Sequence, residues 1–166
     1  MKEIYFIRHA KTEKYERYDF IRKLTDIGVL QAKNLGLKFE NLQIYPQIIF
    51  SSSAFRAKMT TNHILKNMNI DNMLDLRLYY IPEIYFFDCV EKMVDFIRKI
   101  DDKFEKIFVV GHNPAIAETA NFLCKDFEIE SFSPSSCLGI KFEVENFSEI
   151  SQNSGKKIFY HNPKEN

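Results

Sequence analysis

The stretch KEIYFIRHAKTE, residues 2–13, decides how the rest of the chain is interpreted. Residues 4–7 are apolar at every position, which is typical of a strand that is covered on both faces. We therefore expect a central parallel strand over residues 3–8. This strand ends on Arg8 and His9, so a cation and an imidazole stand side by side where a buried segment leaves the sheet.

The same order of a short apolar strand and a helix recurs along the chain. The spacing of apolar residues predicts helices over residues 26–39, 57–68, 90–104 and 114–123, and strands at 48–50 and 106–111. CLGIKFEVENF and KKIFYHNP, which begin at Cys137 and Lys156, predict two terminal strands. This order predicts an α/β fold: a three-layer sandwich with a mostly parallel central sheet, helices on both faces and antiparallel edge strands.

Two of the predicted helices have recognisable starts. Thr25 is suited to be the N-cap of the first, with Asp26 in its first turn. Asn113 is suited to be the N-cap of the last, with Pro114 at the first helical position. That last helix would begin directly behind His112 and offer backbone N–H groups to an anion.

Length and composition limit the function classes. The chain has 166 residues, about the size of one domain, so we expect residues 1–166 to form a single domain. Lys plus Arg and Asp plus Glu number 23 each, so no overall field favours nucleic acid or a membrane surface. No signal peptide or membrane span is apparent, which predicts a cytoplasmic protein. Three widely spaced cysteines indicate neither a disulfide framework nor a zinc site.

Residues capable of chemistry follow three of the predicted strands. Arg8 and His9 follow the first, Arg56 lies in the first turn of the helix behind the second, and His112 follows the strand that begins at residue 106. Ligands of open α/β sheets bind beyond the carboxyl ends of the strands. Two arginines and two histidines are therefore expected to meet at one edge of the sheet.

This set suits a phosphoryl group. Arginine offers a rigid fork of donors to phosphate oxygens and neutralises the charge that grows in the transition state. A neutral imidazole can act as nucleophile and a charged one as donor near neutral pH. We assign His9 as the nucleophile and His112 as the donor, although the residues alone would also allow the reverse.

Six segments in order along the chain carry a family resemblance. They are RHAKT from Arg8, DFIRKLTDIGVLQA from Asp19, SSSAFRAKMTT from Ser51, EIYFFDCVEKMVDFI from Glu83, VVGHNPAIAETANFL from Val109 and SGKKIFYHNPK from Ser154. Together they resemble the histidine phosphatase superfamily, which has the phosphoglycerate-mutase-like fold, and within it the SixA-like phosphohistidine phosphatases.

The resemblance implies roles for the matching residues. Arg8, Arg56 and His112 would form the phosphate pocket, and His9 would be phosphorylated transiently, with no metal or organic cofactor. Two positions depart from the common pattern: Ala10 stands where many members have glycine, and Lys23 where a proline often follows the arginine. Neither change touches the proposed chemistry.

The proton donor is not fixed by these motifs. An ester leaving group needs a general acid, whereas imidazole departs more easily. Glu83 is our candidate, and Asp88 and Glu91 are alternatives. Asp19, Arg22 and Thr25 form a further polar group that could line the mouth of the site or serve only to pair and cap, and we favour the structural role.

These observations predict a metal-independent phosphatase that hydrolyses phosphohistidine on a protein partner through a covalent intermediate on His9. The partner would be a phosphorelay or phosphocarrier domain, because the short interval between Arg56 and His112 leaves little room for a lid domain. The alternative is a small-molecule phosphomonoesterase or mutase-like enzyme. A non-catalytic phosphate-recognition module is the third reading, but binding alone would not require His9.

Overall fold

The computed structural model describes residues 1–14 and 17–165. The strands are β1 (Lys2–Arg8), β2 (Ile48–Ser52), β3 (Arg77–Ile81), β4 (Lys106–Gly111), β5 (Cys137–Phe142) and β6 (Gly155–His161). The α-helices are α1 (Asp26–Asn41), α2 (Phe55–Leu65), α3 (Pro82–Phe86), α4 (Val90–Arg98) and α5 (Ala115–Leu123). Short 3₁₀ helices are η1 (Asp19–Ile21), η2 (Ile70–Met73) and η3 (Phe147–Glu149).

The strands form one sheet in the order β3-β2-β4-β1-β5-β6. Strands β1, β2, β3 and β4 pair in parallel, whereas β5 runs antiparallel to β1 and β6 antiparallel to β5. The predicted α/β class is confirmed, including the central position of the first strand and the antiparallel strands at one edge.

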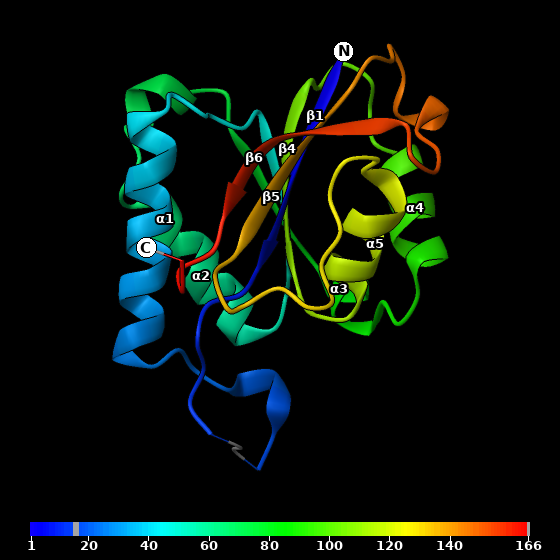
Figure 1. Ribbon diagram of the computed structural model, residues 1–166. Coiled ribbons are helices and arrows are strands. Elements are labelled where there is room, and N and C mark those ends of the chain that lie inside the picture. The colour runs from blue at the N-terminus through cyan, green and yellow to red at the C-terminus, as the bar shows by residue number, and fades with distance from the viewer. Residues whose placement is uncertain (15–16, 166) are drawn as a thin grey trace.

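Helices cover both faces of this sheet. Figure 1 shows α1 and α2 on one side and α3, α4 and α5 on the other. The side chains of β1 divide between the two apolar cores: Ile4 and Phe6 lie in the core with α4 and α5, and Tyr5 and Ile7 in the core with α1 and α2. This division is the physical reason why the strand is apolar at every position.

Helix α1 begins as the sequence predicts. The Thr25 hydroxyl accepts a hydrogen bond from the Gly28 N–H at 3.0 Å, which satisfies one of the free donors of the first turn. The helix then packs against α2 at Gly36, where an added Cβ would lie 2.3 Å from the backbone oxygen of Ile64. The two helix backbones therefore approach so closely that only glycine fits.

Gly36→Ala is expected to destabilise the protein by roughly 3 kcal/mol, because a backbone atom cannot move aside as a flexible side chain can. Urea unfolding followed by circular dichroism measures this free energy. Asn34→Ala, at an exposed position of the same helix, is the control and should be neutral or slightly stabilising. Equal stability of Gly36→Ala and wild type would contradict the close approach.

Three predicted helices have wrong boundaries. The helix predicted over residues 57–68 spans Phe55–Leu65. The third helix ends at Arg98 and not near Phe104, because Asp101 accepts a hydrogen bond from the Lys103 N–H at 3.0 Å and forms a turn there. The last helix begins at Ala115, and the Asn113 side chain does not cap it. The Asn113 amide instead donates to the Phe132 carbonyl oxygen at 2.9 Å.

The sequence analysis also missed β3 and α3. Strand β3 lies at the edge of the sheet and is partly exposed, so the contrast between its faces is weak. Pro82 occupies the first turn of α3, a position that proline favours and that could have marked the boundary between the two.

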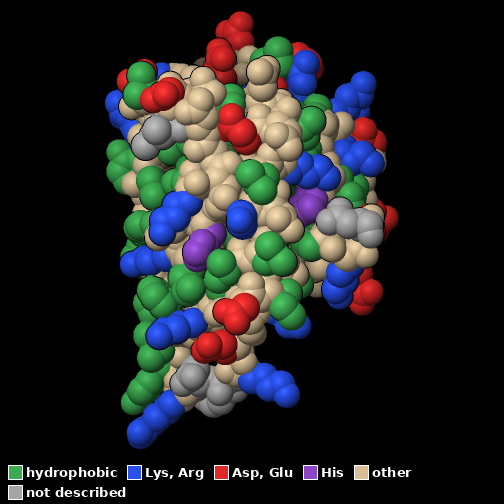
Figure 2. All heavy atoms as spheres, turned by 90° about the vertical axis from the view of Figure 1, so that its left-hand side faces the viewer, with side chains coloured by type: hydrophobic (Ala, Val, Ile, Leu, Met, Phe, Trp, Pro, Cys, Tyr) green, Lys and Arg blue, Asp and Glu red, His purple; other side chains and the backbone are tan. Residues whose placement is uncertain are grey.

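The surface reflects the equal numbers of acidic and basic residues in the chain. Acidic and basic side chains are interspersed over the face that carries α1 (Figure 2). Within the described part of the chain, no helix combines the length and the apolar character needed to cross a membrane.

Candidate active site

The four residues predicted from the strand ends lie together at the carboxyl edge of the sheet. Arg8 ends β1 and His9 follows it, Arg56 lies in the first turn of α2, and His112 follows β4. Strands β2, β4 and β1 are neighbours, so the turns behind them converge. The rings of His9 and His112 have centroids 5.1 Å apart.

His9 is held in one orientation. It is only 7% exposed, and its Nδ1 lies 2.8 Å from the Ala10 carbonyl oxygen. Since a carbonyl can only accept, Nδ1 carries the proton and Nε2 has the free lone pair. Arg56 Nε donates to this Nε2 at 3.3 Å. The nitrogen that could attack phosphorus is therefore aimed at the guanidinium group.

The surroundings keep His9 neutral. Burial is the main cause that lowers its pKa well below the ordinary value of 6.5, and the nearby His112, Arg56 and Arg8 lower it further. The hydrogen bond to the Ala10 carbonyl acts in the opposite direction but is outweighed. At neutral pH the ring consequently keeps the lone pair that a nucleophile needs.

His112 is also neutral. Its Nε2 lies 2.8 Å from the Ser52 hydroxyl, and its buried Nδ1 has no hydrogen-bond partner among the described residues. Burial, followed by the charge of Arg56, lowers the pKa of His112 to about 3. A phosphoryl dianion beside the ring would favour the protonated form and so oppose this shift.

The two arginines bring positive charge to the same place. Arg8 donates from Nη1 to the Phe132 carbonyl oxygen. Burial lowers the pKa of Arg8, and so do the charges of Arg56 and Arg22. Arg56 is 5% exposed. An anion is the ligand that such a group of desolvated cations favours.

Asp19 and Tyr85 belong to this group, although the sequence analysis gave Asp19 a structural role and did not single out Tyr85. Arg56 donates from Nη1 to the Asp19 backbone oxygen at 2.9 Å and from Nη2 to its carboxylate at 3.0 Å. The Tyr85 hydroxyl donates to the same carboxylate at 2.9 Å. Neither residue lies on a long periodic element, so apolar spacing gave no signal for them.

Glu83 is not brought into this group. It is exposed on α3, one position from the buried Ile84. Its side chain lines a separate hollow with Phe87, Lys92 and Phe96. Among the described residues it has no hydrogen bond to any of the other four predicted site residues.

The two departures from the family pattern are accommodated locally. Ala10 is fully buried, and its N–H donates to the Thr60 hydroxyl at 2.9 Å. Lys23 is exposed and uses its carbonyl oxygen to accept from the Glu13 N–H at 3.0 Å. Within residues 1–14 and 17–165, no group of three or more His, Cys, Asp or Glu side chains is placed to hold a metal ion.

The buried histidines make stability depend on pH. Burial lowers the pKa of His112 to about 3 and, with the charge of Lys38, that of His161 to about 4. The unfolded chain has a histidine pKa of about 6.5, so between these values it binds more protons than the folded chain. Stability is therefore full above about pH 6.5 and falls as the pH drops through this window.

We expect the free energy of unfolding to fall between pH 7 and pH 5 by roughly 1–2 kcal/mol for each such histidine. Urea unfolding at both pH values measures the change. His161→Gln, which lies outside the site, should show a smaller fall than wild type. A wild-type protein that is more stable at pH 5 than at pH 7 would contradict the assignment.

Comparison with known proteins agrees with this geometry. A family model described as "Histidine phosphatase superfamily (branch 1)" matches residues 4–80, which include Arg8, His9, Asp19 and Arg56. No curated protein matches the sequence.

Solved structures share the fold over nearly the whole chain. The protein histidine phosphatase SixA in complex with tungstate has a TM-score of 0.80 at 15% identity, with 98% of each chain covered. A proposed phosphohistidine phosphatase SixA from Agrobacterium tumefaciens has a TM-score of 0.78 at 21% identity, covering 98% of this chain and 99% of that one. The phosphoserine phosphatase of Entamoeba histolytica has a TM-score of 0.60 at 14% identity, with 99% and 98% covered.

Proposed function

We propose that the chain is a histidine phosphatase, as the family model over residues 4–80 suggests, and that it removes the phosphoryl group from phosphohistidine on a partner protein. The reaction would pass through a covalent intermediate on His9 and would need no metal. The observation that carries the proposal is the tautomer of His9: its Nδ1 donates to the Ala10 carbonyl, so the lone pair lies on Nε2 and can attack phosphorus once the contact with Arg56 Nε is given up.

In the first step, His9 Nε2 forms a bond to phosphorus while the bond between phosphorus and the substrate imidazole breaks. The electron pair of the broken bond stays on the departing nitrogen, and the substrate ring leaves as neutral imidazole because its other nitrogen already carries a proton. Arg8, Arg56 and His112 donate to the three equatorial oxygens, where charge accumulates.

In the second step, water attacks the phosphorus on His9 and inorganic phosphate leaves. His9 Nε2 regains its lone pair, and the ring returns to the tautomer that donates to the Ala10 carbonyl. Both steps use the same donors, because the phosphoryl group moves in line between the incoming and leaving atoms.

The arrangement of carboxylates favours phosphohistidine over esters. An alkoxide leaving group needs a proton donor, and Glu83 lines a separate hollow. Asp19 contacts Arg56 and Tyr85, and the Tyr85 hydrogen bond and the charges of Arg56 and Arg22 lower its pKa, so at neutral pH it is ionised and has no proton to donate. A substrate whose leaving group is imidazole has the least need for a proton donor, so it suits such a site best.

A phosphorylated histidine carrier domain tests the proposal. Carrier, enzyme and a metal chelator are mixed, and the loss of acid-labile phosphate from the carrier is followed by phosphate-affinity electrophoresis. We expect rapid loss with wild type, and we expect Glu83→Gln to leave the rate within about twofold. Carriers that keep their phosphate with folded enzyme present would contradict the proposal.

Glu83→Gln also distinguishes the proposed phosphohistidine phosphatase from the alternative, a small-molecule phosphomonoesterase. p-Nitrophenyl phosphate and alkyl phosphates serve as small esters, of which the alkyl phosphates depend more on a proton donor. If alkyl phosphates are turned over faster than the carrier and Glu83→Gln abolishes that turnover, the protein is a phosphomonoesterase with Glu83 as its acid.

A further inference from the structure

The carboxylate of Asp19 occupies one N–H group of Arg56 and one of Arg22 that a phosphoryl group could use. All three nitrogens of the Arg56 guanidinium have an acceptor: Nε donates to His9 Nε2, Nη1 to the Asp19 backbone oxygen and Nη2 to Asp19 Oδ2. The other carboxylate oxygen of Asp19 pairs with Arg22 Nη2 at 2.9 Å. One anionic side chain thus joins two cations of the site.

Tyr85 contacts the same carboxylate oxygen as Arg56. Its hydroxyl donates to Asp19 Oδ2 at 2.9 Å. Its ring meets the His112 ring edge-on at 5.6 Å and the Phe20 ring edge-on at 5.1 Å. Tyr85 therefore connects η1 to the group of site residues, and Asp19 is positioned by contacts from two separate elements.

Asp19 is ionised in this arrangement. Burial alone would raise its pKa, but the hydrogen bond from Tyr85 and the charges of Arg56 and Arg22 together lower it. A carboxylate and a phosphoryl dianion are both acceptors with negative charge, so they compete for the same guanidinium N–H groups and repel each other at short range.

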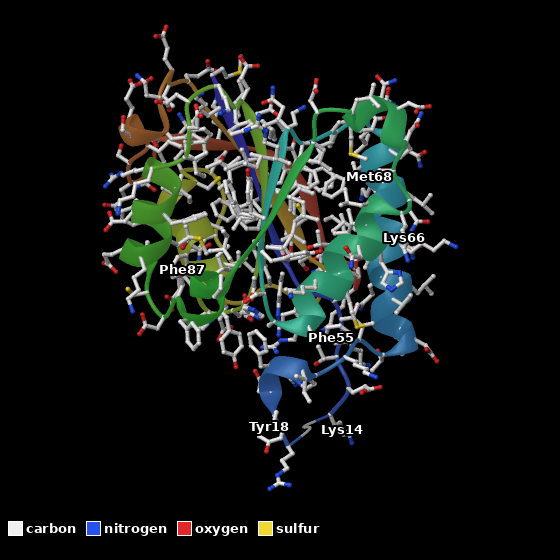
Figure 3. The ribbon with its side chains drawn as sticks, turned by 180° about the vertical axis from the view of Figure 1, so that it is seen from behind. Lys14, Tyr18, Phe55, Lys66, Met68 and Phe87 are labelled. Carbon is white, nitrogen blue, oxygen red and sulfur yellow. The ribbon has the colours of Figure 1, made fainter. Side chains whose placement is uncertain are left out.

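Asp19 can move into water more easily than Arg56. The side chain of Asp19 is 40% exposed and that of Arg56 only 6%. Asp19 belongs to the segment between β1 and α1 that projects beyond the edge of the sheet (Figure 1), and Figure 3 shows this segment below Phe55, at the amino end of α2, with Tyr18 pointing outward. A shift of η1 would release the carboxylate into water.

We propose that Asp19 is an internal counter-ion of the phosphate site, which an incoming phosphoryl group displaces from Arg56. The proposal rests on the proposed function in one respect, namely that the phosphoryl group lies beside Arg56. It assigns Asp19 a role in affinity: the carboxylate weakens the binding of every phosphoryl ligand by the same amount. Free phosphate makes no contacts outside the phosphate site, so the weakened binding lets it leave readily. A phosphorylated substrate makes further contacts outside this site, and these compensate for the weakened binding.

Equilibrium binding of inorganic phosphate, measured by titration calorimetry, tests this role. Asp19→Asn keeps the size of the side chain and an oxygen that can accept from Arg56, but removes the charge. We expect it to bind phosphate about tenfold more tightly than wild type. Tyr85→Phe, which removes one hydrogen bond from the carboxylate, should change the affinity in the same direction by a smaller factor.

Asp75→Asn is the matched control. Asp75 is exposed just before β3, at the amino end of the sheet, so this variant removes the same charge far from the site. Its phosphate affinity should equal that of wild type. An equal gain in Asp75→Asn would mean that net charge and not the position of Asp19 sets the affinity, which would overturn the proposal.

Other outcomes are equally decisive. If Asp19→Asn binds phosphate as weakly as wild type or more weakly, or if neither binds it, Asp19 only positions Arg56 and the proposal is wrong. Because binding is measured without turnover, the result is independent of the substrate. Tighter binding by Asp19→Asn with no dephosphorylation of carriers would contradict the proposed function and leave the role of Asp19 standing.

Discussion

His9→Ala is expected to lower the rate of carrier dephosphorylation by roughly 10⁴-fold, the largest loss of any single substitution in the protein. The imidazole is the proposed nucleophile, and no other described side chain presents a neutral nitrogen with a free lone pair to Arg56. Water would have to attack the substrate directly, and only the remaining donors would assist it.

The measurement has two parts. Initial rates with phosphorylated carrier give the loss of activity, and mass spectrometry at alkaline pH detects acid-labile phosphate on the enzyme. Wild type should carry phosphate on His9, and the variant should carry none. A variant that still becomes phosphorylated would place the nucleophile elsewhere, with His112 the first candidate because its ring lies next to that of His9.

His63→Ala is the control for this experiment. His63 lies in α2, in the same helix as Arg56, and is half-buried outside the site. This variant removes the same type of side chain as His9→Ala, but one that has no proposed role in the reaction. The rate and the labelling should therefore stay close to those of wild type. Loss of activity in this variant would show that the assay responds to general damage to the fold.

Arg56→Lys is expected to lower kcat/KM by roughly 10²–10³-fold although the positive charge is retained. Lysine has no Nε donor that could reach His9 Nε2 while a second group holds a phosphate oxygen. The planar fork of arginine contacts His9 Nε2 and the Asp19 carboxylate at the same time. The loss should appear mainly in kcat, because the guanidinium stabilises the charge that grows on the phosphoryl oxygens in the transition state.

Arg98→Lys is a matched control, since Arg98 Nε also donates a single hydrogen bond, to the Ile150 carbonyl oxygen at 2.9 Å, at the far end of α4. It should leave kcat/KM unchanged and cost only stability. If Arg56→Lys retains activity within tenfold of wild type, charge alone is sufficient at this position, and the alignment of His9 by Arg56 Nε is unimportant.

The residues that follow buried strands were predictable because local sequence determines their place. Arg8, His9 and His112 come directly after apolar segments, and Arg56 begins a helix behind a third. Parallel strands in one sheet bring such positions to the same edge. The roles of these residues, like the prediction of a single domain over residues 1–166, stay predictions that the experiments above test.

The partners of these residues could not be predicted in the same way. Asp19 reaches Arg56 across 37 positions of sequence, and it lies in a three-residue helix without periodicity. Tyr85 belongs to a short helix after an edge strand, where the apolar pattern is weak. Asn113 has the residue type and position of a helix cap, but its side chain found a different acceptor in the loop at Phe132.

The contact between Arg8 and the Phe132 carbonyl has a consequence for how the protein comes into being. These residues are 124 positions apart, and Ser135 and Ser136 pair with the backbone of His9 and Arg8 in the same loop. Contacts of such long range cannot form before both ends of the chain segment exist, and closing the segment costs chain entropy. A chain still emerging from the ribosome, with its first two thirds exposed, has therefore not yet assembled its active site, and activity arises only when the last third has docked.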